Sequence, residues 1–200
     1  MVECVKSKDI VNTLVQVLYA TMRMVEPYTF QHGERVGGLA FEAAVGDALG
    51  FPADQLEGLR VAGCLHDIGK IAIPVEILVK TGPLTLEEFA LVKTHVLRGY
   101  EMLSPFNWPW PVADVALQHH ERIDGSGYPH GLTGDLINPY AKIIAVTDTV
   151  EAMVSHRPYR PGLGLDAALA VINDGRGTLY DADVVDVVTH VLTVQGFKIS

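Results

Sequence analysis

Apolar side chains recur at intervals of three and four residues along most of the chain, which is the spacing of one face of an α-helix. The first such segment covers residues 10–24. The same pattern, together with the proline and glycine positions, predicts further helices over residues 28–49, 52–66, 85–100, 112–120, 139–155, 165–173 and 182–194. No stretch alternates convincingly between apolar and polar positions, so the sequence predicts an all-α fold.

Several helix ends are marked by residues that favour them. Pro27 is expected to break the first helix, and Gly50 is a favourable residue just past the end of the second. Thr85 and Glu88 form a capping box, in which the side chain of each binds the backbone N–H of the other. A helix is therefore expected to begin at Thr85 and to continue through His95.

The predicted helices fit a single globular unit. We expect residues 1–27 to form a lead-in helix and residues 28–200 to form the domain itself. Apolar residues make up 48% of the chain and the mean hydropathy is +0.23, which is enough for a well-filled core. The most apolar window, Ile143 to Val154, is interrupted by Asp148 and Glu151, so no membrane insertion is expected.

Charge and cysteine content narrow the class of protein. The formal net charge of −9 argues against binding to long nucleic acid, although local cations can still hold a small anionic ligand. The two cysteines, Cys4 and Cys64, are too few for a disulfide framework. Because the N-terminus also lacks the pattern of a secretion signal, we expect a reduced, cytoplasmic protein.

The segment His66-Asp67-Ile68-Gly69-Lys70 is a candidate for metal chemistry. Adjacent residues on a helix point about 100° apart, so this histidine can offer nitrogen to one metal ion while the aspartate offers oxygens to two. Lys70 lies four residues after His66, on the same helix face, where its charge can meet an anionic substrate. A single His-Asp pair is common on protein surfaces, so its meaning depends on the rest of the chain.

Other ligand-type residues are placed where helices can direct them into a common core. The full set is His32, His66, Asp67, His95, His119, His120 and Asp148. Nitrogen and oxygen ligands without thiolate suit iron, manganese or zinc in a bundle core better than a structural Cys-type zinc site. Adjacent helical residues diverge, so His119 and His120 can bind one ion only if the helix ends there, as the following Gly-rich segment indicates.

These residues belong to a longer pattern that resembles the HD-GYP domain, a branch of the HD phosphohydrolase superfamily that hydrolyses cyclic di-GMP. The matching residues are His32-x-x-Arg35-Val36, His66-Asp67-Ile68-Gly69-Lys70, Ile73-Pro74, Lys80-Thr81-Gly82-Pro83-Leu84-Thr85, Glu88, His95, Gly99, the signature His119-His120-Glu121-Arg122-Ile123-Asp124-Gly125-Ser126-Gly127-Tyr128-Pro129, Asp148 and Arg157-Pro158-Tyr159-Arg160. They cover roughly residues 28–190 in the order of the family. The resemblance implies an HD-domain helical bundle with a metal site in its core.

The resemblance also implies a binuclear metal site. One ion would be held by His32, His66, Asp67 and Asp148, and the other by Asp67, His95, His119 and His120. Asp67 would then bridge the ions, and a hydroxide between them would attack the phosphate. Iron and manganese share this ligand set, so the native metal stays open.

Some members of the family bind a third metal through a glutamate four residues before the first histidine. This sequence has Tyr28 at that position, and Glu26 lies two residues further back. The chain departs from the three-metal pattern at a direct ligand. We therefore expect two ions.

The resemblance assigns roles around the metals. Lys70 resembles the phosphate-contacting lysine of the family, which stabilises negative charge in the transition state. Arg157 and Arg160 suit phosphate oxygens and guanine edges, with ion pairs inside their own loop as the alternative. Tyr128 can stack on a guanine or wedge its loop, and the sequence does not decide between the two.

Glu121 and Asp124 are expected to act one step behind the ligands. A carboxylate that accepts a hydrogen bond from the second ring nitrogen of a ligand histidine fixes the orientation of that ring. The alternative is a salt bridge of these carboxylates with Arg122 at the helix end.

The predicted function is a metal-dependent phosphodiesterase that opens cyclic di-GMP to linear pGpG, with further cleavage to GMP left open. Asp67 and Lys70 are the expected catalytic residues. One alternative is a receptor or interaction module that binds a cyclic dinucleotide with little turnover, and another is a phosphodiesterase that prefers cyclic GMP-AMP. Every binuclear ligand position is filled, which favours an enzyme. The resemblance also implies contacts of the Tyr128 loop with a protein partner.

Overall fold

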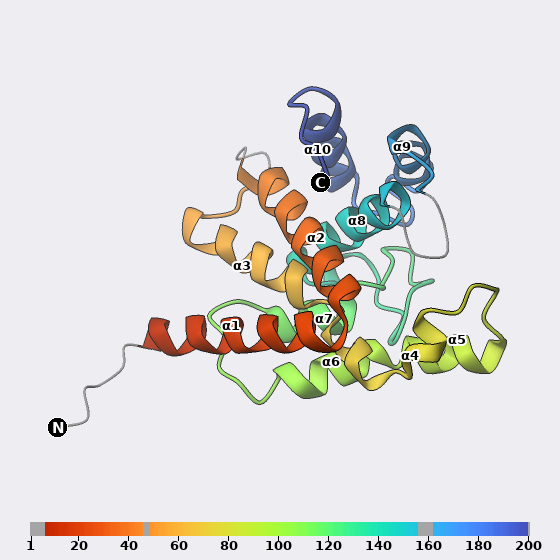
Figure 1. Cartoon of the computed structure of the whole chain (residues 1–200). Helices are drawn as coiled ribbons and strands as arrows, with labels where there is room; N and C mark the ends of the chain where they lie inside the picture. Colours follow the sequence, from red (N-terminus) through yellow and green to blue (C-terminus); the bar gives the residue numbers. More distant parts are fainter. Residues whose placement is uncertain (1–6, 46–48, 156–161, 200) are drawn as a thin grey trace.

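The computed structural model of the protein describes residues 7–45, 49–155 and 162–199, which form a helical bundle (Figure 1). Its elements are α1 (Ser7–Val25), α2 (Pro27–Val45), α3 (Ala53–Leu65), η1 (Ile68–Ala72), α4 (Val75–Leu78), α5 (Leu86–Lys93), α6 (His95–Leu103), α7 (Val112–Gln118), η2 (Gly134–Leu136), α8 (Pro139–Val154), α9 (Leu165–Asp174) and α10 (Ala182–Thr193). The described residues contain two isolated β-bridges and no strand, so the all-α prediction is confirmed. Within those residues, no helix is both long enough and apolar enough to cross a membrane.

Two clusters of buried apolar side chains hold the helices together. The first joins α2, α3 and α7 to α8, α9 and α10, and includes Val36 and Ile144. The second joins α1, α2 and α3 to α6 and α7, and includes Phe30 and Leu65. Because Met22 of α1 is buried in the second cluster, α1 packs directly onto the bundle, at the lower left in Figure 1. The division of the chain at residue 28 stays a prediction.

Helices α2 and α3 approach each other closely at a contact made by glycines. A Cβ atom added to Gly37 would lie 2.5 Å from the carbonyl oxygen of Arg60, and one added to Gly63 would lie 2.5 Å from the Cα of Gly37. This close approach brings His32 on α2 beside His66, which directly follows α3, with ring centroids 5.2 Å apart. The glycines therefore set the spacing on which the candidate site depends.

Replacing Gly37 with alanine is expected to lower the free energy of unfolding by about 1–3 kcal/mol, because the added methyl group overpacks the contact between the helices. Gly38→Ala is a matched control on the same helix, since a Cβ there would meet nothing within 4 Å. That control should be neutral or stabilising by roughly 0.5–1 kcal/mol, the usual gain from Gly to Ala inside a helix. Urea denaturation of the two variants measures the difference, and equal stabilities would contradict the packing argument.

The second predicted helix, over residues 28–49, begins one residue earlier in the structure. It begins at Pro27 and its described part ends at Val45. Pro27 starts α2 rather than only ending α1, because the first residue of a helix needs no N–H partner and the proline ring already has a helical φ. The carboxylate of Glu26 accepts a hydrogen bond from the N–H of Thr29 at 2.5 Å, which satisfies one free donor of this first turn.

The prediction of one helix over residues 85–100 is wrong, although its predicted start is confirmed. Thr85 and Glu88 form the capping box, with N···O distances of 2.7 and 3.2 Å. The helix then breaks at Thr94, whose hydroxyl and N–H both donate to the carbonyl oxygen of Leu91, at 2.7 and 3.0 Å. This local hydrogen bonding competes with the helical pattern, and a new helix begins at His95.

Candidate metal centre

A cluster of ligand-type side chains lies in the core of the bundle. It contains all seven ligands that the sequence analysis singled out: His32, His66, Asp67, His95, His119, His120 and Asp148. Most of these side chains are almost completely buried. An ensemble of buried imidazoles and carboxylates is costly unless its members bind each other or a cation.

Helix ends place most of these ligands. His66 is the residue that follows α3, Asp67 comes next as the chain enters η1, and His95 is the first residue of α6. His119 and His120 follow the last residue of α7, so the predicted helix end at this pair is confirmed. At such ends the backbone leaves the regular helix, and adjacent side chains can turn toward the same point.

The carboxylate of Asp67 lies at the centre of the cluster. Its Oδ2 atom is 3.3 Å from Nε2 of His66 and 3.7 Å from Nε2 of His32. Its Oδ1 atom is 3.2 Å from Nε2 of His95 and 3.7 Å from Nε2 of His119. Each oxygen therefore faces a different pair of histidines.

The ligand atoms separate into two groups that share this aspartate. We call the first group position one and the second group position two. Position one is formed by His32, His66, Asp67 and Asp148, and position two by Asp67, His95, His119 and His120. In position one, Oδ1 of Asp148 lies 3.0 Å from Nε2 of His32.

The unsatisfied polar atoms of the cluster fit a cation. Among the described residues, Nε2 of His32, Nε2 of His66 and Oδ1 of Asp67 are buried and have no partner with hydrogen-bond geometry. In position two, Nε2 of His95 and Nε2 of His119 lie 3.3 Å apart. Buried atoms with lone pairs rarely stay unpaired, and these converge on common points as the ligands of a metal ion do.

Main-chain carbonyls fix the rings of three histidines through their other nitrogen. Nδ1 of His66 lies 2.5 Å from the carbonyl oxygen of Gly63, and Nδ1 of His95 lies 2.7 Å from that of Val92. Nδ1 of His119 lies 3.1 Å from the carbonyl oxygen of Ala116. With the proton on Nδ1, each ring presents the lone pair of Nε2 to the centre of the cluster.

In His32, the partner of Nδ1 is a carboxylate rather than a main-chain carbonyl, and this contact was not predicted from the sequence. This Nδ1 atom is hydrogen-bonded to Oε2 of Glu151, while the other oxygen, Oε1, accepts from Nε of Arg35 and from Oγ of Ser155, both at 2.6 Å. Glu151 has no exposed surface. The available signal was its position three residues after Asp148, on the same face of α8.

The orienting roles predicted for Glu121 and Asp124 are corrected by the structure. The carboxylate of Glu121 accepts hydrogen bonds from the N–H groups of His130 and Leu132, at 2.8 and 2.9 Å, and so closes the loop that follows α7. Asp124 is exposed and caps its own turn through Ser126. Both carboxylates bind groups of their own loop instead of the ligand rings, because the chain changes direction where α7 ends.

The pKa values of three of the histidines are shifted, and not all in the same direction. Burial lowers the pKa of His32, but its hydrogen bonds with Asp148 and Glu151 outweigh burial and raise it to about 9. Burial and the neighbouring histidines lower the pKa of His119 to about 4, and burial holds that of His120 well below its usual value. His119 and His120 are therefore neutral imidazoles at neutral pH, the form that binds metals, whereas His32 is held in its charged form by two carboxylates that a metal cation could bind in place of the proton.

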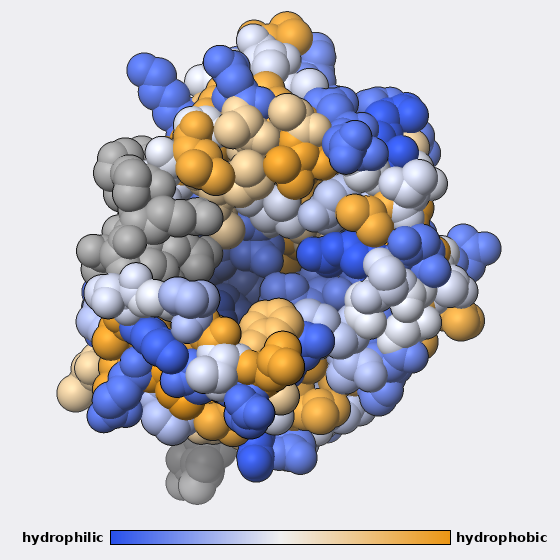
Figure 2. Space-filling view, turned by 90° about the vertical axis from the view of Figure 1, so that its right-hand side faces the viewer, coloured by the Kyte–Doolittle hydropathy of each residue, from blue (hydrophilic) through white to orange (hydrophobic). Residues whose placement is uncertain are grey.

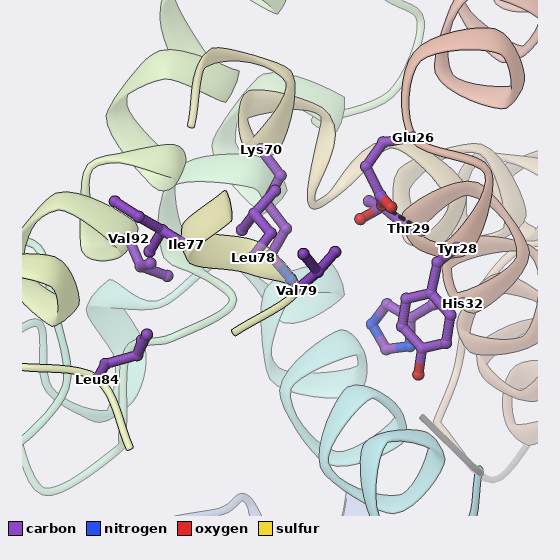
Figure 3. Close-up of a pocket in the computed structure, with 10 residues that line it drawn as sticks. All are labelled: Glu26, Tyr28, Thr29, His32, Lys70, Ile77, Leu78, Val79, Leu84 and Val92. Carbon is purple, nitrogen blue, oxygen red and sulfur yellow. Dashed lines mark hydrogen bonds between the residues drawn. The ribbon is translucent and has the colours of Figure 1, made fainter. Parts of the chain in front are cut away.

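A cavity of about 180 Å³ opens beside position one. Tyr28 and His32 of α2 lie on one side of it, apolar side chains of α4 and α5 lie on the other, and Lys70 lines it from η1 (Figure 3). The ammonium group of Lys70 also contacts Oδ2 of Asp67, and 22% of the lysine side chain is exposed. On the face toward α5, the molecular surface is hollowed and the floor of the hollow is hydrophilic (Figure 2).

Tyr128 lies against the ligands. Its ring stacks on that of His120, with centroids 4.7 Å apart and an interplanar angle of 22°. The ammonium group of Lys93 lies 5.0 Å from the centre of the tyrosine ring. The sequence left two roles open for this residue, and its contact with His120 adds a third, support of a ligand ring. The predicted substrate contacts of Arg157 and Arg160 lie outside the described residues.

Comparison with known proteins identifies relatives of the chain. A model of the HD domain family matches residues 16–184. The chain is 44% identical over 144 residues to the cyclic di-GMP phosphodiesterase response regulator RpfG of Xanthomonas campestris, a match that covers 71% of this chain and 38% of that protein. It is 39% identical over 181 residues to a cyclic di-GMP phosphodiesterase of Thermotoga maritima, which covers 90% of this chain and 49% of that protein.

A third relative has a different name. The chain is 37% identical over 164 residues to the 3'3'-cGAMP-specific phosphodiesterase 3 of Vibrio cholerae, a match that covers 78% of this chain and 34% of that protein. The chain thus spans half the length of these relatives or less.

Solved structures establish the fold. Bd1817, a HDG"Y"P protein from Bdellovibrio bacteriovorus, has a TM-score of 0.67 at 20% identity, and the match covers 92% of this chain and 59% of that one. A cyclic GMP-AMP specific phosphodiesterase of Vibrio cholerae has a TM-score of 0.64 at 17% identity, and the match covers 90% of this chain and 48% of that one. The predicted HD-domain helical bundle is confirmed.

Proposed function

The chain belongs to the HD domain family, in its HD-GYP branch, and from this premise we propose that it is a metal-dependent phosphodiesterase that hydrolyses cyclic di-GMP. The observation that carries the proposal is Asp67, whose two oxygens face two separate groups of histidines. Position one and position two are the proposed sites of two divalent ions. Iron and manganese are the proposed metals, because both suit this set of nitrogen and oxygen ligands.

The chain's own residues bind and orient the substrate in this proposal. Bound divalent ions would supply Lewis-acid charge and would lower the pKa of a bound water molecule toward neutrality. Lys70 lies between Asp67 and the cavity, where its ammonium group can bind a phosphate oxygen. Tyr28 and the apolar wall of the cavity give a flat group such as a purine base a surface to pack against.

The remaining parts of the proposal concern the stoichiometry, the partners and the location. Tyr28 occupies the place of a third metal ligand, and the carboxylate of Glu26 is bound to the N–H of Thr29, which supports two ions rather than three. The loop of residues 125–129, in which Ser126 is exposed, is the proposed contact with a protein partner. The buried thiol of Cys64 supports a reducing, cytoplasmic location.

Product analysis tests the proposed function. The protein is prepared without oxygen, loaded with iron or manganese, and incubated with cyclic di-GMP. We expect pGpG to appear only with metal, and elemental analysis to give two ions per chain. A sample treated with a chelator is the control and should give no product.

Other outcomes of this experiment separate the alternatives. Cyclic di-GMP that binds without turnover, in a protein that holds two ions, would favour a receptor. Faster hydrolysis of cyclic GMP-AMP would assign that substrate instead. One of the relatives of the chain is named as a phosphodiesterase specific for it. Three ions per chain would contradict the binuclear assignment.

A further inference from the structure

The two candidate metal positions share Asp67 but otherwise differ in charge. Position one contains a second carboxylate, that of Asp148, within 3.0 Å of Nε2 of His32. Position two adds only imidazoles to the shared aspartate. A divalent ion at position one therefore meets two carboxylates directly, whereas an ion at position two meets one.

A third carboxylate stands behind position one. Glu151 accepts from Nδ1 of His32, so the Nε2 atom of that ring points toward Asp67 and Asp148. A carboxylate behind a ligand histidine makes the ring a stronger donor to a metal ion than a neutral carbonyl does. Arg35 binds the far oxygen of Glu151, so it fixes the geometry of the carboxylate while the nearer oxygen stays on the histidine.

The supports of position two are uncharged. The Nδ1 atoms of His95 and His119 lie against main-chain carbonyl oxygens, and the ring of His120 is stacked on Tyr128. Two cations near position one act in the opposite direction. Arg35 pairs with Glu151 on the side away from His32, and Lys70 contacts Oδ2 of Asp67. The long side chain of Lys70 is partly exposed on the cavity wall and can turn away when an ion binds.

We propose that Glu151 is a positioning residue for His32 that makes the two metal positions unequal, so that position one fills before position two. The inference rests on the proposed function only in requiring that both positions bind divalent ions. It predicts a state with one ion per chain at limiting metal. It also predicts that the affinity of position one depends on a side chain that touches neither the ion nor the substrate.

Binding of Mn²⁺ alone tests this inference. Free Mn²⁺ is followed by electron paramagnetic resonance as the metal is added to the full chain from which metal has been removed. We expect two classes of site whose dissociation constants differ at least about tenfold. The signal of two coupled ions should appear only after the first equivalent has bound.

The variant Glu151→Gln removes the charge but keeps an oxygen that can accept from His32. It is expected to weaken the tighter class by about 10–100-fold, the usual cost of losing the partner of a ligand histidine, and to leave the weaker class within about twofold. Asp186→Asn is the matched control. It removes the same charge from an exposed ion pair with Arg176 and should leave both classes unchanged.

Two further variants keep the result interpretable. His120→Ala should abolish the weaker class and spare the tighter one, which assigns the classes to the two positions. If Glu151→Gln does not fold, Ser155→Ala removes one hydrogen bond to Glu151 and should weaken the same class by a smaller factor.

The opposing outcomes are distinct. Identical sites in the unaltered chain, or equal weakening of both classes by Glu151→Gln, would overturn the inference and leave the proposed phosphodiesterase standing. A chain that binds no Mn²⁺ and no iron would instead overturn the proposed function itself.

Discussion

The variant Asp67→Asn is expected to lose the proposed phosphodiesterase activity almost completely, with a fall in kcat on the order of 10⁴-fold or more. Each oxygen of Asp67 faces a different pair of histidines, so one substitution weakens both metal positions. Metal ions at such a site contribute several kcal/mol to the stabilisation of the transition state, and about 1.4 kcal/mol corresponds to a factor of ten in rate. No other described residue lies between the two groups of ligands in this way.

The measurement combines turnover of cyclic di-GMP with elemental analysis of the same sample. Asparagine has nearly the shape of aspartate, so the core should stay packed, and circular dichroism should match that of the unaltered chain. Asp186→Asn is again the control, because it makes the same chemical change at an exposed position. If Asp67→Asn kept its activity, the two-metal mechanism would be wrong, whatever the metal content.

Local chemistry explains how much of the fold was predictable. The capping box at Thr85 and the helix end at His119 depend on residues within a few positions of each other, and both predictions are confirmed. The break at Thr94 is also local, but threonine is common inside helices and its sequence signal is weak. The close contact at Gly37 was not predicted, because it needs the partner helix to be known.

The seven candidate ligands were grouped from the sequence before their geometry was known, and the structure brings them together, while their binding of metal stays a prediction. His32 and Asp148 lie far apart in the sequence and were linked by residue type, by their places on predicted helices and by the family pattern, and the structure places their side chains 3.0 Å apart. The supporting carboxylate was assigned to the wrong residue. Glu121 is adjacent to His120 in the sequence but binds the backbone of the loop, whereas Glu151, 119 residues from His32, is the true partner.

The difference between these outcomes is physical. The ligands of a metal site must all reach the same point and must be of a few residue types. Together they form a pattern that can be recognised in a sequence. A residue that supports a ligand needs only one contact, and tertiary packing can supply that contact from any helix. Adjacency in the chain is a poor guide at a helix end, because the backbone leaves the helix there: His119 and His120 converge, whereas the next residue, Glu121, binds the backbone of the loop.

The variant Lys70→Met is expected to lower kcat by about 10²–10³-fold while the metal content stays at its normal value. The ammonium group of Lys70 lies at the cavity wall and contacts Asp67, so it is placed beside both the metal ligands and the space for substrate. A fixed positive charge at the reacting phosphate acts mainly on the transition state, where negative charge increases, and removing one such donor usually costs this factor. Methionine keeps the length of the apolar stem.

A comparison of kcat with KM distinguishes this role from simple binding of the substrate. If Lys70 held the ground state and the transition state equally, Lys70→Met would raise KM and leave kcat unchanged. Lys142→Met is a suitable control, because Lys142 pairs with Asp181 at 3.2 Å and lies more than one turn from Asp148 along α8. A loss of bound metal in Lys70→Met would show instead that the lysine supports Asp67. That result would place its contribution in the assembly of the site and leave the charge of the transition state to the metals alone.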